Sequence, residues 1–453
     1  MKPVKIKDNL YWVGGIDWDI RSFHGYSTPR GTTYNAYLII DEKITLVDTV
    51  KHYLFDEMLA RISAIIDPAK IDYIVSNHVE MDHSGGLPRI MEVAPQAKIF
   101  TSPNGEKGLK AHYKGNWDFK VMKSGETLSL GTRSLTFVHT PMVHWPDNMV
   151  CFMPEEKILF SNDAFGQHIA SSERFDNQFP PGILLEEAAK YYANIVLPYG
   201  GNVQKVLEAI SGLEIDMIAP SHGIIWSSHI QDISRDYRKW SGNVTDNKAV
   251  IVYDSMWGST EKIAYAVQDA FENKGILTTM MNLKANDISD IMTQILTAKY
   301  ICVGSPTLNN NMLPTVAGFL SYLKGLAPKK RLGLAFGSYG WGGQSVGQIE
   351  EILKSAGFEL MDQVRIQYIP DAEQLADISK KIEEGVAQIE KEHEERYKQL
   401  LQNIEEGKVF KKDGKVYWKC RNCGHIHEAL EAPEECPVCA HPKAYFETVS
   451  RVY

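Results

Sequence analysis

The chain has 453 residues, which is too long for one hydrophobic core and suggests about three domains. Its net charge of −9, without a basic stripe, argues against a nucleic-acid partner, and 44% hydrophobic with 23% charged residues is ordinary for a globular protein. No segment reaches the length of a membrane span, no apolar leader follows Met1, and the six cysteines imply no disulfide framework, so we expect a soluble protein of the reducing cytoplasm.

The first informative segment is an apolar run at residues 71–76, typical of a strand, which leads into the sequence HVEMDH at residues 78–83. Four of these six residues can bind a metal. Zinc hydrolases of the metallo-β-lactamase fold carry His-x-His-x-Asp-His here, whereas this chain has Glu80 in place of the second His. A carboxylate adds negative charge and hardness, which favours iron or manganese over zinc. The substitution therefore points to redox chemistry rather than hydrolysis.

Further candidate ligands follow later strand-like runs. They are His144, Asp163 and His222. A lone histidine is more often a satisfied structural residue than a ligand, but four strand ends with ligands in matching order are a strong pattern. The set contains four histidines and three carboxylates, which is enough for two metals that share one bridging carboxylate.

A new β pattern starts after residues 239–247, so we expect a first domain at residues 1–244 and a second at 245–403. Three loops in this second domain, each after an apolar run, are rich in small polar residues. Such loops at the strand ends of a doubly wound sheet form a ligand crevice, and the first has the form of a phosphate cradle at a helix start. The set resembles flavodoxin and implies FMN. The residues expected to hold it are Ser255, Met256, Trp257, Gly258, Ser259, Thr260, Ser305, Pro306, Thr307, Leu308, Asn309, Asn310, Ser338, Tyr339, Gly340, Trp341 and Gly342.

A long charged helix is expected from about residue 372 to 403, followed by a third domain at residues 404–453. That domain carries two Cys-x-x-Cys motifs, which predict a tetrahedral four-thiolate site. Its ligands would be Cys420, Cys423, Cys436 and Cys439. Spacing alone also allows a zinc ribbon, but the surrounding residues resemble the rubredoxin-like domain of rubrerythrins, which implies iron. The other two cysteines, Cys151 and Cys302, lie in apolar segments and are expected to be buried thiols.

Together these motifs, with the runs at residues 31–38 and 46–49, resemble the flavodiiron proteins over nearly the whole chain. The resemblance implies an α/β multidomain fold: a metallo-β-lactamase-like αββα sandwich, a flavodoxin-like doubly wound parallel sheet and a small rubredoxin-like metal domain. It assigns His78, Glu80 and His144 to one iron, and a second set to the other iron. That second set is Asp82, His83 and His222, with Asp163 bridging. It also places His24 and one of Tyr191 and Tyr192 near the distal face of the diiron site, where packing roles are equally plausible.

The resemblance further implies an oxidoreductase that reduces O2 to water, NO to N2O, or both, with electrons passing from Fe(Cys)4 to FMN to the diiron site. The electron donor would be an NAD(P)H-dependent rubredoxin reductase or a similar protein, and the chain would form a homodimer or a dimer of dimers, without nucleic acid or membrane. Two alternatives are a zinc hydrolase of the glyoxalase type with accessory redox domains, against which Glu80 argues, and a non-catalytic electron shuttle, against which the complete ligand set argues.

Overall fold

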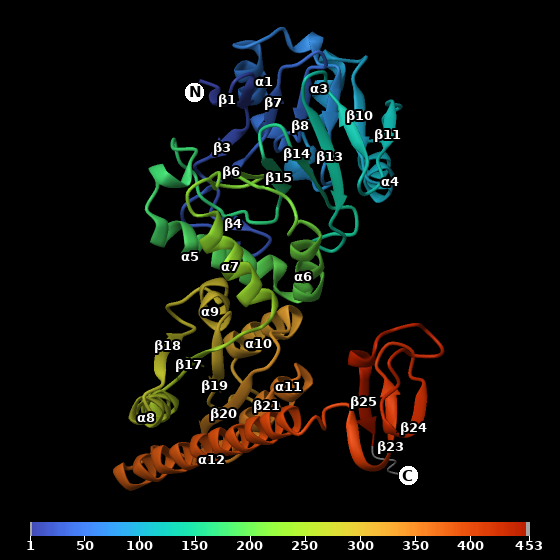
Figure 1. Ribbon diagram of the computed structural model, residues 1–453. Helices are drawn as coiled ribbons and strands as arrows, with labels where there is room; N and C mark the ends of the chain where they lie inside the picture. Colours follow the sequence, from blue (N-terminus) through green and yellow to red (C-terminus); the bar gives the residue numbers. More distant parts are fainter. Residues whose placement is uncertain (1, 450–453) are drawn as a thin grey trace. The chain divides into compact units, whose positions relative to one another are not determined.

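The computed structural model describes residues 2–449, apart from the side chains of residues 392 and 393, and the chain divides into two compact units at residues 379 and 380. The first unit contains an αββα sandwich followed by a parallel sheet flanked by helices, and the second contains a small three-stranded sheet (Figure 1). The division falls inside one long helix. The domain limits at residues 244 and 403 stay predictions. Among residues 2–449 no helix is both long and apolar enough to cross a membrane.

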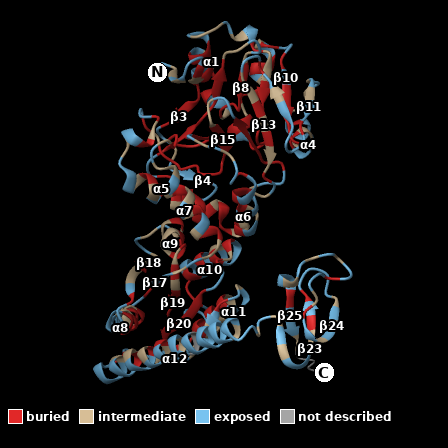
Figure 2. Cartoon of the chain, viewed as in Figure 1, coloured by how far each residue is buried: buried red, intermediate tan, exposed pale blue. Residues whose placement is uncertain are grey.

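The sandwich consists of two facing sheets with the order β1-β2-β7-β8-β9-β10-β11 and β12-β13-β14-β15-β16. Their inward side chains form one apolar core, and strands such as β14 are buried along their whole length (Figure 2). The strands of the first sheet are β1 Val4–Lys7, β2 Leu10–Trp12, β7 Tyr37–Ile39, β8 Thr45–Val47, β9 Tyr73–Val75, β10 Lys98–Thr101 and β11 Phe119–Val121. Those of the second are β12 Thr127–Ser129, β13 Ser134–His139, β14 Met149–Met153, β15 Ile158–Asn162 and β16 Met217–Pro220.

Helices cover the outer faces of both sheets, because each buries an apolar stripe there. The helices on the first sheet are α1 Phe55–Ser63, α3 Leu87–Val93 and α4 Pro103–Tyr113, and those on the second are α5 Pro181–Tyr191, α6 Gly200–Ala209 and α7 Ile230–Ser241. The remaining elements of the sandwich are short. They are β3 Gly15–Asp17, β4 Ser22–Phe23, β5 Tyr26–Ser27, β6 Thr32–Tyr34, η1 His52–Leu54, η2 Pro68–Lys70, α2 Met81–Ser84, η3 Asp176–Gln178, the π-helix η4 Tyr192–Val196 and η5 Leu197–Tyr199.

The second part of this unit is a six-stranded parallel sheet with helices between successive strands, as expected for a doubly wound fold. The order is β18-β17-β19-β20-β21, and β22 also pairs with β20. Its strands are β17 Asp246–Tyr253, β18 Leu277–Asn282, β19 Ala298–Gly304, β20 Leu332–Tyr339, β21 Glu359–Leu360 and β22 Val364–Gln367. Its helices are α8 Ser259–Asn273, α9 Ile288–Ile295, α10 Pro314–Leu326, α11 Gln344–Ser355 and the start of α12 Ala372–Glu405.

The sandwich and the parallel sheet share one continuous apolar cluster. Polar contacts reinforce it: Asn194 Nδ2 donates to the carbonyl of Ser289 at 3.1 Å, and Tyr322 Oη donates to Asn194 Oδ1 at 2.9 Å. The end of α7 lies beside the starts of strands β17 and β20: Lys239 Nζ donates to Asp246 Oδ1 at 2.6 Å, and the Lys329 amide donates to Asn243 Oδ1 at 2.9 Å. The carboxyl ends of the strands therefore lie at the opposite edge.

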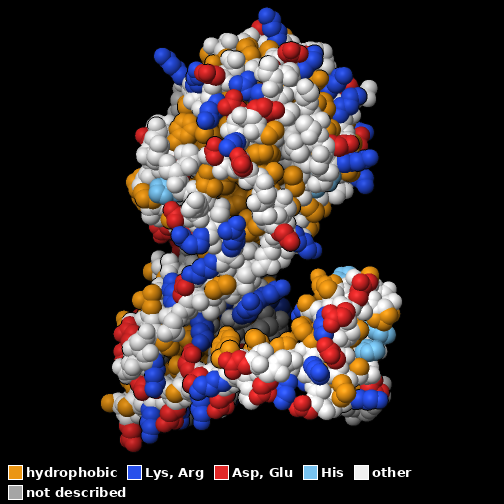
Figure 3. Space-filling model, viewed as in Figure 1, with side chains coloured by type: hydrophobic (Ala, Val, Ile, Leu, Met, Phe, Trp, Pro, Cys, Tyr) orange, Lys and Arg blue, Asp and Glu red, His pale blue; other side chains and the backbone are white. Residues whose placement is uncertain are grey.

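The small sheet of the second unit has the order β24-β23-β25, with β23 Lys411–Cys420, β24 Ile426–Glu431, β25 Phe446–Val449 and the turn η6 Lys443–Tyr445. Its core is only a few residues: Trp418, Cys420, Ala432, Cys436 and Phe446. So small a core needs additional stabilisation, and a bound metal is the common source of it. On the face shown in Figure 3, acidic and basic side chains are interspersed across the molecular surface.

Candidate functional site

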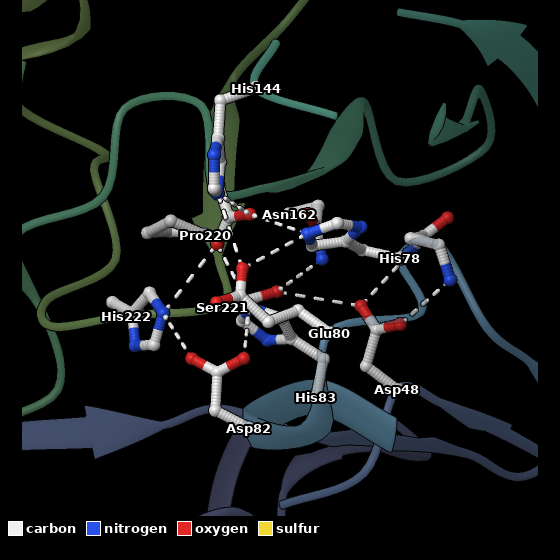
Figure 4. Close-up of polar contacts among 12 residues, drawn as sticks. Asp48, His78, Glu80, Asp82, His83, His144, Asn162, Pro220, Ser221 and His222 are labelled. Atoms are coloured by element: carbon white, nitrogen blue, oxygen red, sulfur yellow. Dashed lines mark hydrogen bonds and ion pairs between the residues drawn. The ribbon is translucent and has the colours of Figure 1, made fainter. Parts of the chain in front are cut away.

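All seven metal ligands expected in the first domain lie on one rim of the sandwich, on loops that follow strands β9, β13, β15 and β16. Figure 4 shows six of them, His78, Glu80, Asp82, His83, His144 and His222, pointing towards a common centre. The rim forms because four strands end at the same edge of the sandwich, so that residues far apart in the sequence meet there.

The first group of ligands is His78, Glu80, His144 and Asp163, whose donor atoms all lie within 4.8 Å of one another. Glu80 Oε2 is 3.3 Å from both His78 Nε2 and His144 Nε2. His78 is fully buried and Glu80 is 8% exposed. This is a mixed nitrogen and oxygen set of the kind that binds iron or manganese.

The second group is Asp82, His83 and His222. Asp82 Oδ2 lies 3.2 Å from His222 Nε2, and Asp82 Oδ1 lies 3.3 Å from His83 Nε2. All three side chains are buried. The group therefore offers two imidazoles and a carboxylate in a water-poor environment.

Asp163 lies between the two groups and presents one oxygen to each. Its Oδ2 is 3.4 Å from His144 Nε2, and its Oδ1 is 2.9 Å from His83 Nε2 and 3.5 Å from His222 Nε2. That arrangement is the geometry of a bridging carboxylate.

Several buried ligand atoms have no hydrogen-bond partner outside these two groups: both oxygens of Asp82, both oxygens of Asp163 and both ring nitrogens of His83. Buried polar atoms are almost always satisfied in folded proteins. Ligand atoms that converge in this way, with no partner outside the groups, fit a pair of cations at the centre. His83 Nε2 lies within 3.3 Å of an oxygen of Asp82 and an oxygen of Asp163, so it faces the group.

The metal-free groups also show shifted pKa values. Burial lowers the pKa of His78, but its hydrogen bonds with Asp147 and Glu80 and the charge of Asp163 outweigh burial and raise it to about 10. The pKa of His144 rises to about 10 and that of His83 to about 9, because carboxylates outweigh burial there too. Burial raises the pKa of Glu80, but hydrogen bonds from His144, His24 and His78 hold it far below its usual range. The cluster thus binds protons where metal ions would supply the positive charge.

Three supporting groups, which the sequence pattern did not reveal, orient these ligands. Asp147 Oδ2 accepts hydrogen bonds from His78 Nδ1 at 2.8 Å and from the Val79 amide at 2.8 Å. The carbonyl of Thr33 lies 2.8 Å from His222 Nδ1. Because both contacts are made at Nδ1, the Nε2 atoms of His78 and His222 stay free to bind a metal. Metal-binding histidines usually donate their other ring N–H to a carboxylate or carbonyl in this way. The third, Asp48, accepts from the Asn77 amide at 2.8 Å and fixes the start of the ligand loop.

His24 and Tyr191 reach the site, whereas Tyr192 does not. His24 Nε2 lies 2.7 Å from Glu80 Oε1, on the exposed side of the first group. The Tyr191 ring is 5.9 Å from that of His222, but the Tyr192 ring packs against Tyr237 at 5.0 Å. Because successive helical residues point about 100° apart, the two tyrosines cannot both face the metals.

The three expected FMN loops follow β17, β19 and β20, and hydrogen bonds tie them together. Thr260 Oγ1 and Ser338 Oγ lie 2.9 Å apart, and the Thr307 amide donates to the carbonyl of Ser338 at 3.0 Å. Gly258 adopts a φ of +85° just before α8, where a side chain would be strained. The loop thereby turns its amides towards the helix start, as a phosphate cradle requires.

Trp257 in the first loop and Trp341 in the third are each 93% exposed. Exposed apolar surface that gathers beside a polar loop commonly marks a ligand-binding site. Two indole rings beside a phosphate cradle fit the flat ring of FMN. All seventeen expected FMN residues belong to these three joined loops or to the first residues of α8 and the last of β20.

The four cysteines of the second unit converge as expected. Their sulfurs lie within 4.8 Å of one another, with 3.6 Å between Cys420 and Cys439 and 3.6 Å between Cys423 and Cys436. The backbone amides of Cys423 and Asn422 lower the pKa of the Cys420 thiol to about 6. A thiolate at neutral pH is the form that binds metal. The other two thiols, Cys151 and Cys302, are buried in the first unit, as expected.

Three family models match the chain: ODP family beta lactamase at residues 32–223, flavodoxin at 251–382, and the rubredoxin-like domain of rubrerythrin at 418–447. The chain is 48% identical to a nitric oxide reductase of Moorella thermoacetica over 83% of its own length and 96% of the relative's. It is 45% identical to a rubredoxin-oxygen oxidoreductase of Megalodesulfovibrio gigas, covering 84% of this chain and 98% of that protein. The crystal structure of a flavodiiron protein from Giardia intestinalis superposes with a TM-score of 0.83 at 32% identity, covering 85% and 96% of the two chains.

Proposed function

The chain belongs to the flavodiiron family, and on that premise we propose that it is an oxidoreductase that reduces O2 to water, NO to N2O, or both. The observation that carries the proposal is the double ligand group bridged by Asp163, with Glu80 where a hydrolase would have histidine, in one chain with flavin loops and a four-thiolate site. Reduction of O2 consumes four electrons and four protons to give two waters. Reduction of two NO consumes two electrons and two protons to give N2O and one water.

When bound, the thiolate iron and FMN would supply electron transfer, and the paired irons would supply a binding place for the diatomic gas. We propose that one iron is held by His78, Glu80 and His144, the other by Asp82, His83 and His222, and that Asp163 bridges them. We assign the phosphate of FMN to the loop around Gly258 and its ring to the space beside Trp257 and Trp341.

The protein's own groups prepare the site in three ways. Asp147 and the Thr33 carbonyl hold the rings of His78 and His222 in one orientation and one tautomer. Burial of both ligand groups excludes bulk water and strengthens their electrostatic interactions. His24, hydrogen-bonded to Glu80 at 2.7 Å on the exposed side, can donate a proton towards the metals.

Whether the gas is O2, NO or both stays open, because the relatives include proteins named for each. A zinc hydrolase is the second candidate, favoured only by the shared sandwich fold. Glu80 argues against it, since zinc sites of hydrolases prefer a third imidazole at this position.

We further propose that the working form is a dimer in which FMN of one chain serves the metals of the other. Within one chain, the flavin loops lie at the edge of the parallel sheet opposite to the sandwich. Strand β17 alone, with 8 residues, spans about 26 Å. A two-fold head-to-tail pairing would bring the flavin edge of each chain to the metal rim of its partner.

Complementation tests the dimer. His222→Ala should lose an iron and keep FMN, whereas Gly258→Asp should place a carboxylate in the phosphate cradle and lose FMN while keeping its irons. Each variant alone should be inactive. Random exchange of subunits should restore about a quarter of wild-type activity per chain, because half of the dimers would contain one complete site. Verified heterodimers without activity would contradict the arrangement.

The electron donor is proposed to be an NAD(P)H-dependent rubredoxin reductase or a similar protein that docks at the four-thiolate domain. The six cysteines of the chain are all free, which supports the proposed cytoplasmic location.

The proposed function itself is tested by steady-state consumption of O2 and of NO by iron- and FMN-loaded protein with one artificial reductant. Turnover of at least one gas is expected, and turnover of neither would refute the proposal.

A further inference from the structure

Three buried polar atoms without hydrogen-bond partners lie between a surface cleft and the metal ligand His222. They are Glu187 Oε2, Tyr26 Oη and His168 Nε2. The residues are 5%, 2% and 0% exposed. Buried polar atoms are normally satisfied by protein or by internal water. Unsatisfied atoms on these three residues, which are neighbours in space, therefore indicate a short row of internal water molecules (a file) that links them.

The outer end of this file is a cleft of about 360 Å³ between the sandwich and the parallel sheet. Glu187 on α5 lines it, and its Oε1 accepts a hydrogen bond from Arg30 Nε at 3.0 Å. Lys190 lines the cleft one turn further along α5 and is paired with Asp290 of α9. The second carboxylate oxygen of Glu187, Oε2, is buried and has no hydrogen-bond partner.

The charges around Glu187 decide how readily it holds a proton. Burial raises the pKa of Glu187, and the positive charges of Lys190 and Arg30 offset only part of that rise, while Glu186 adds to it. Tyr26 of β5 is a further titratable neighbour of Glu187, and Asp290 of α9 lines the same cleft. Glu187 is thus a carboxyl that stays protonated at a higher pH than an exposed glutamate.

Tyr26 links the cleft to the interior. Its ring lies under Lys190, with Nζ 5.4 Å from the ring centroid, and its other neighbour is His168, with 5.2 Å between ring centroids. Glu187 is its strongest charged neighbour. The Tyr26 side chain is therefore a neighbour of both the Glu187 carboxyl and the His168 imidazole.

His168 forms the inner end. Its Nδ1 lies 2.8 Å from Thr32 Oγ1, and that hydroxyl donates to the carbonyl of Thr33 at 3.2 Å. Thr32 must therefore accept from Nδ1–H, which leaves a lone pair on His168 Nε2. The His168 ring is 5.0 Å from that of His222 and 5.1 Å from that of Tyr191. The file thus ends beside the second ligand group.

We propose that Glu187 takes up protons from solvent at this cleft and passes them, through Tyr26 and internal water, to the His168 side of the metal site. The inference rests on the proposed function, in which each electron delivered to the gas is matched by one proton. The carboxyl O–H bond of Glu187 breaks as an O–H bond forms on the adjacent water, and solvent then reprotonates Glu187.

The test compares loaded Glu187→Gln with loaded Glu186→Gln. Both substitutions replace a carboxyl by an amide on the same helix and in the same cleft, but Glu186 is exposed. Glutamine at position 187 can still accept from Arg30, so the fold should be kept. Tyr26→Phe, which removes only a hydroxyl, is the second variant.

Glu187→Gln should slow gas reduction at least tenfold with unchanged iron, FMN content and rate of FMN reduction, and a small weak acid in the buffer should restore part of the rate. Wild-type turnover should fall as pH rises through the pKa of Glu187, and this limb should vanish in Glu187→Gln but persist in Glu186→Gln. Wild-type rate and pH profile in both Glu187→Gln and Tyr26→Phe would overturn the inference.

Infrared spectroscopy supplies a readout that needs no turnover. A protonated, buried carboxyl gives a carbonyl band that shifts in heavy water, and this band should disappear in Glu187→Gln and remain in Glu186→Gln. If wild-type protein reduces neither gas, the proposed function fails while the band still reports on Glu187. A band that is absent from wild-type protein would overturn the assignment of Glu187 as the proton carrier.

Discussion

Replacing Asp147 by Asn should loosen one metal and leave the other in place. Asp147 is 4% exposed, and one of its oxygens accepts from both His78 Nδ1 and the Val79 amide, each at 2.8 Å. Asn keeps the shape but removes the negative charge that polarises His78. Hydrogen bonds to charged groups contribute about 1.5–3 kcal/mol. Loss of such a supporting group typically weakens metal binding about 10- to 100-fold, or about 1.4 to 2.8 kcal/mol, so the two estimates agree.

The assay is iron retention during a titration with a chelator. Asp147→Asn should lose the iron of the His78, Glu80 and His144 group at about 10- to 100-fold lower chelator concentration, while the iron of the other group is retained. The matched control is Asp176→Asn, another buried carboxylate, which accepts from the amides of residues 227–229 and touches no ligand. That control should cost folding stability and leave iron retention unchanged. Equal retention in Asp147→Asn and wild type would refute the supporting role of Asp147.

Three further predictions concern Glu80, Cys436 and the metal-free protein. Glu80→His should raise the preference of the first group for zinc and abolish gas reduction while FMN content stays unchanged; undiminished turnover would show that Glu80 is not a ligand. Cys436→Ser should remove the visible Fe(Cys)4 absorption and slow turnover with a protein donor, but not with a reductant that reduces FMN directly; equal loss with both reductants would count against an electron-transfer role. In metal-free protein, the pKa values of His78 and His144 are raised to about 10. The stability that this protonation contributes is complete below the unfolded-state pKa near 6.5 and is lost as the pH rises towards 10. The Tm of metal-free protein should therefore fall between pH 7 and 10 by more than that of loaded protein, and an unchanged Tm would contradict the protonated state.

The ligand set could be predicted from the sequence because each ligand follows a recognisable strand and the residue types are chemically distinctive. The prediction was more difficult where a residue acts through another. Asp147 lies in a loop without any periodic pattern, and only the folded chain brings it to His78. Similarly, Glu187, Tyr26 and His168 come from three separate elements, so that no local spacing marks them.

The pair Tyr191 and Tyr192 shows what local geometry adds. The sequence leaves both as candidates, although consecutive residues of a helix cannot face the same point. The structure turns Tyr191 towards His222 and Tyr192 into the cluster with Tyr237 and Trp240. The long charged helix, expected at residues 372–403, spans Ala372–Glu405, because its apolar stripe and its i,i+4 ion pairs are both local features.

The central claim is that this chain holds iron, not zinc, in its first domain together with a flavin in its second. The most direct test is iron, zinc and FMN analysis of protein produced with adequate iron. We expect two irons in the bridged double group and one among the thiolates. The analysis should therefore find about three irons and one FMN per chain. Stoichiometric zinc in the bridged groups, with iron confined to the thiolate site, would contradict the account.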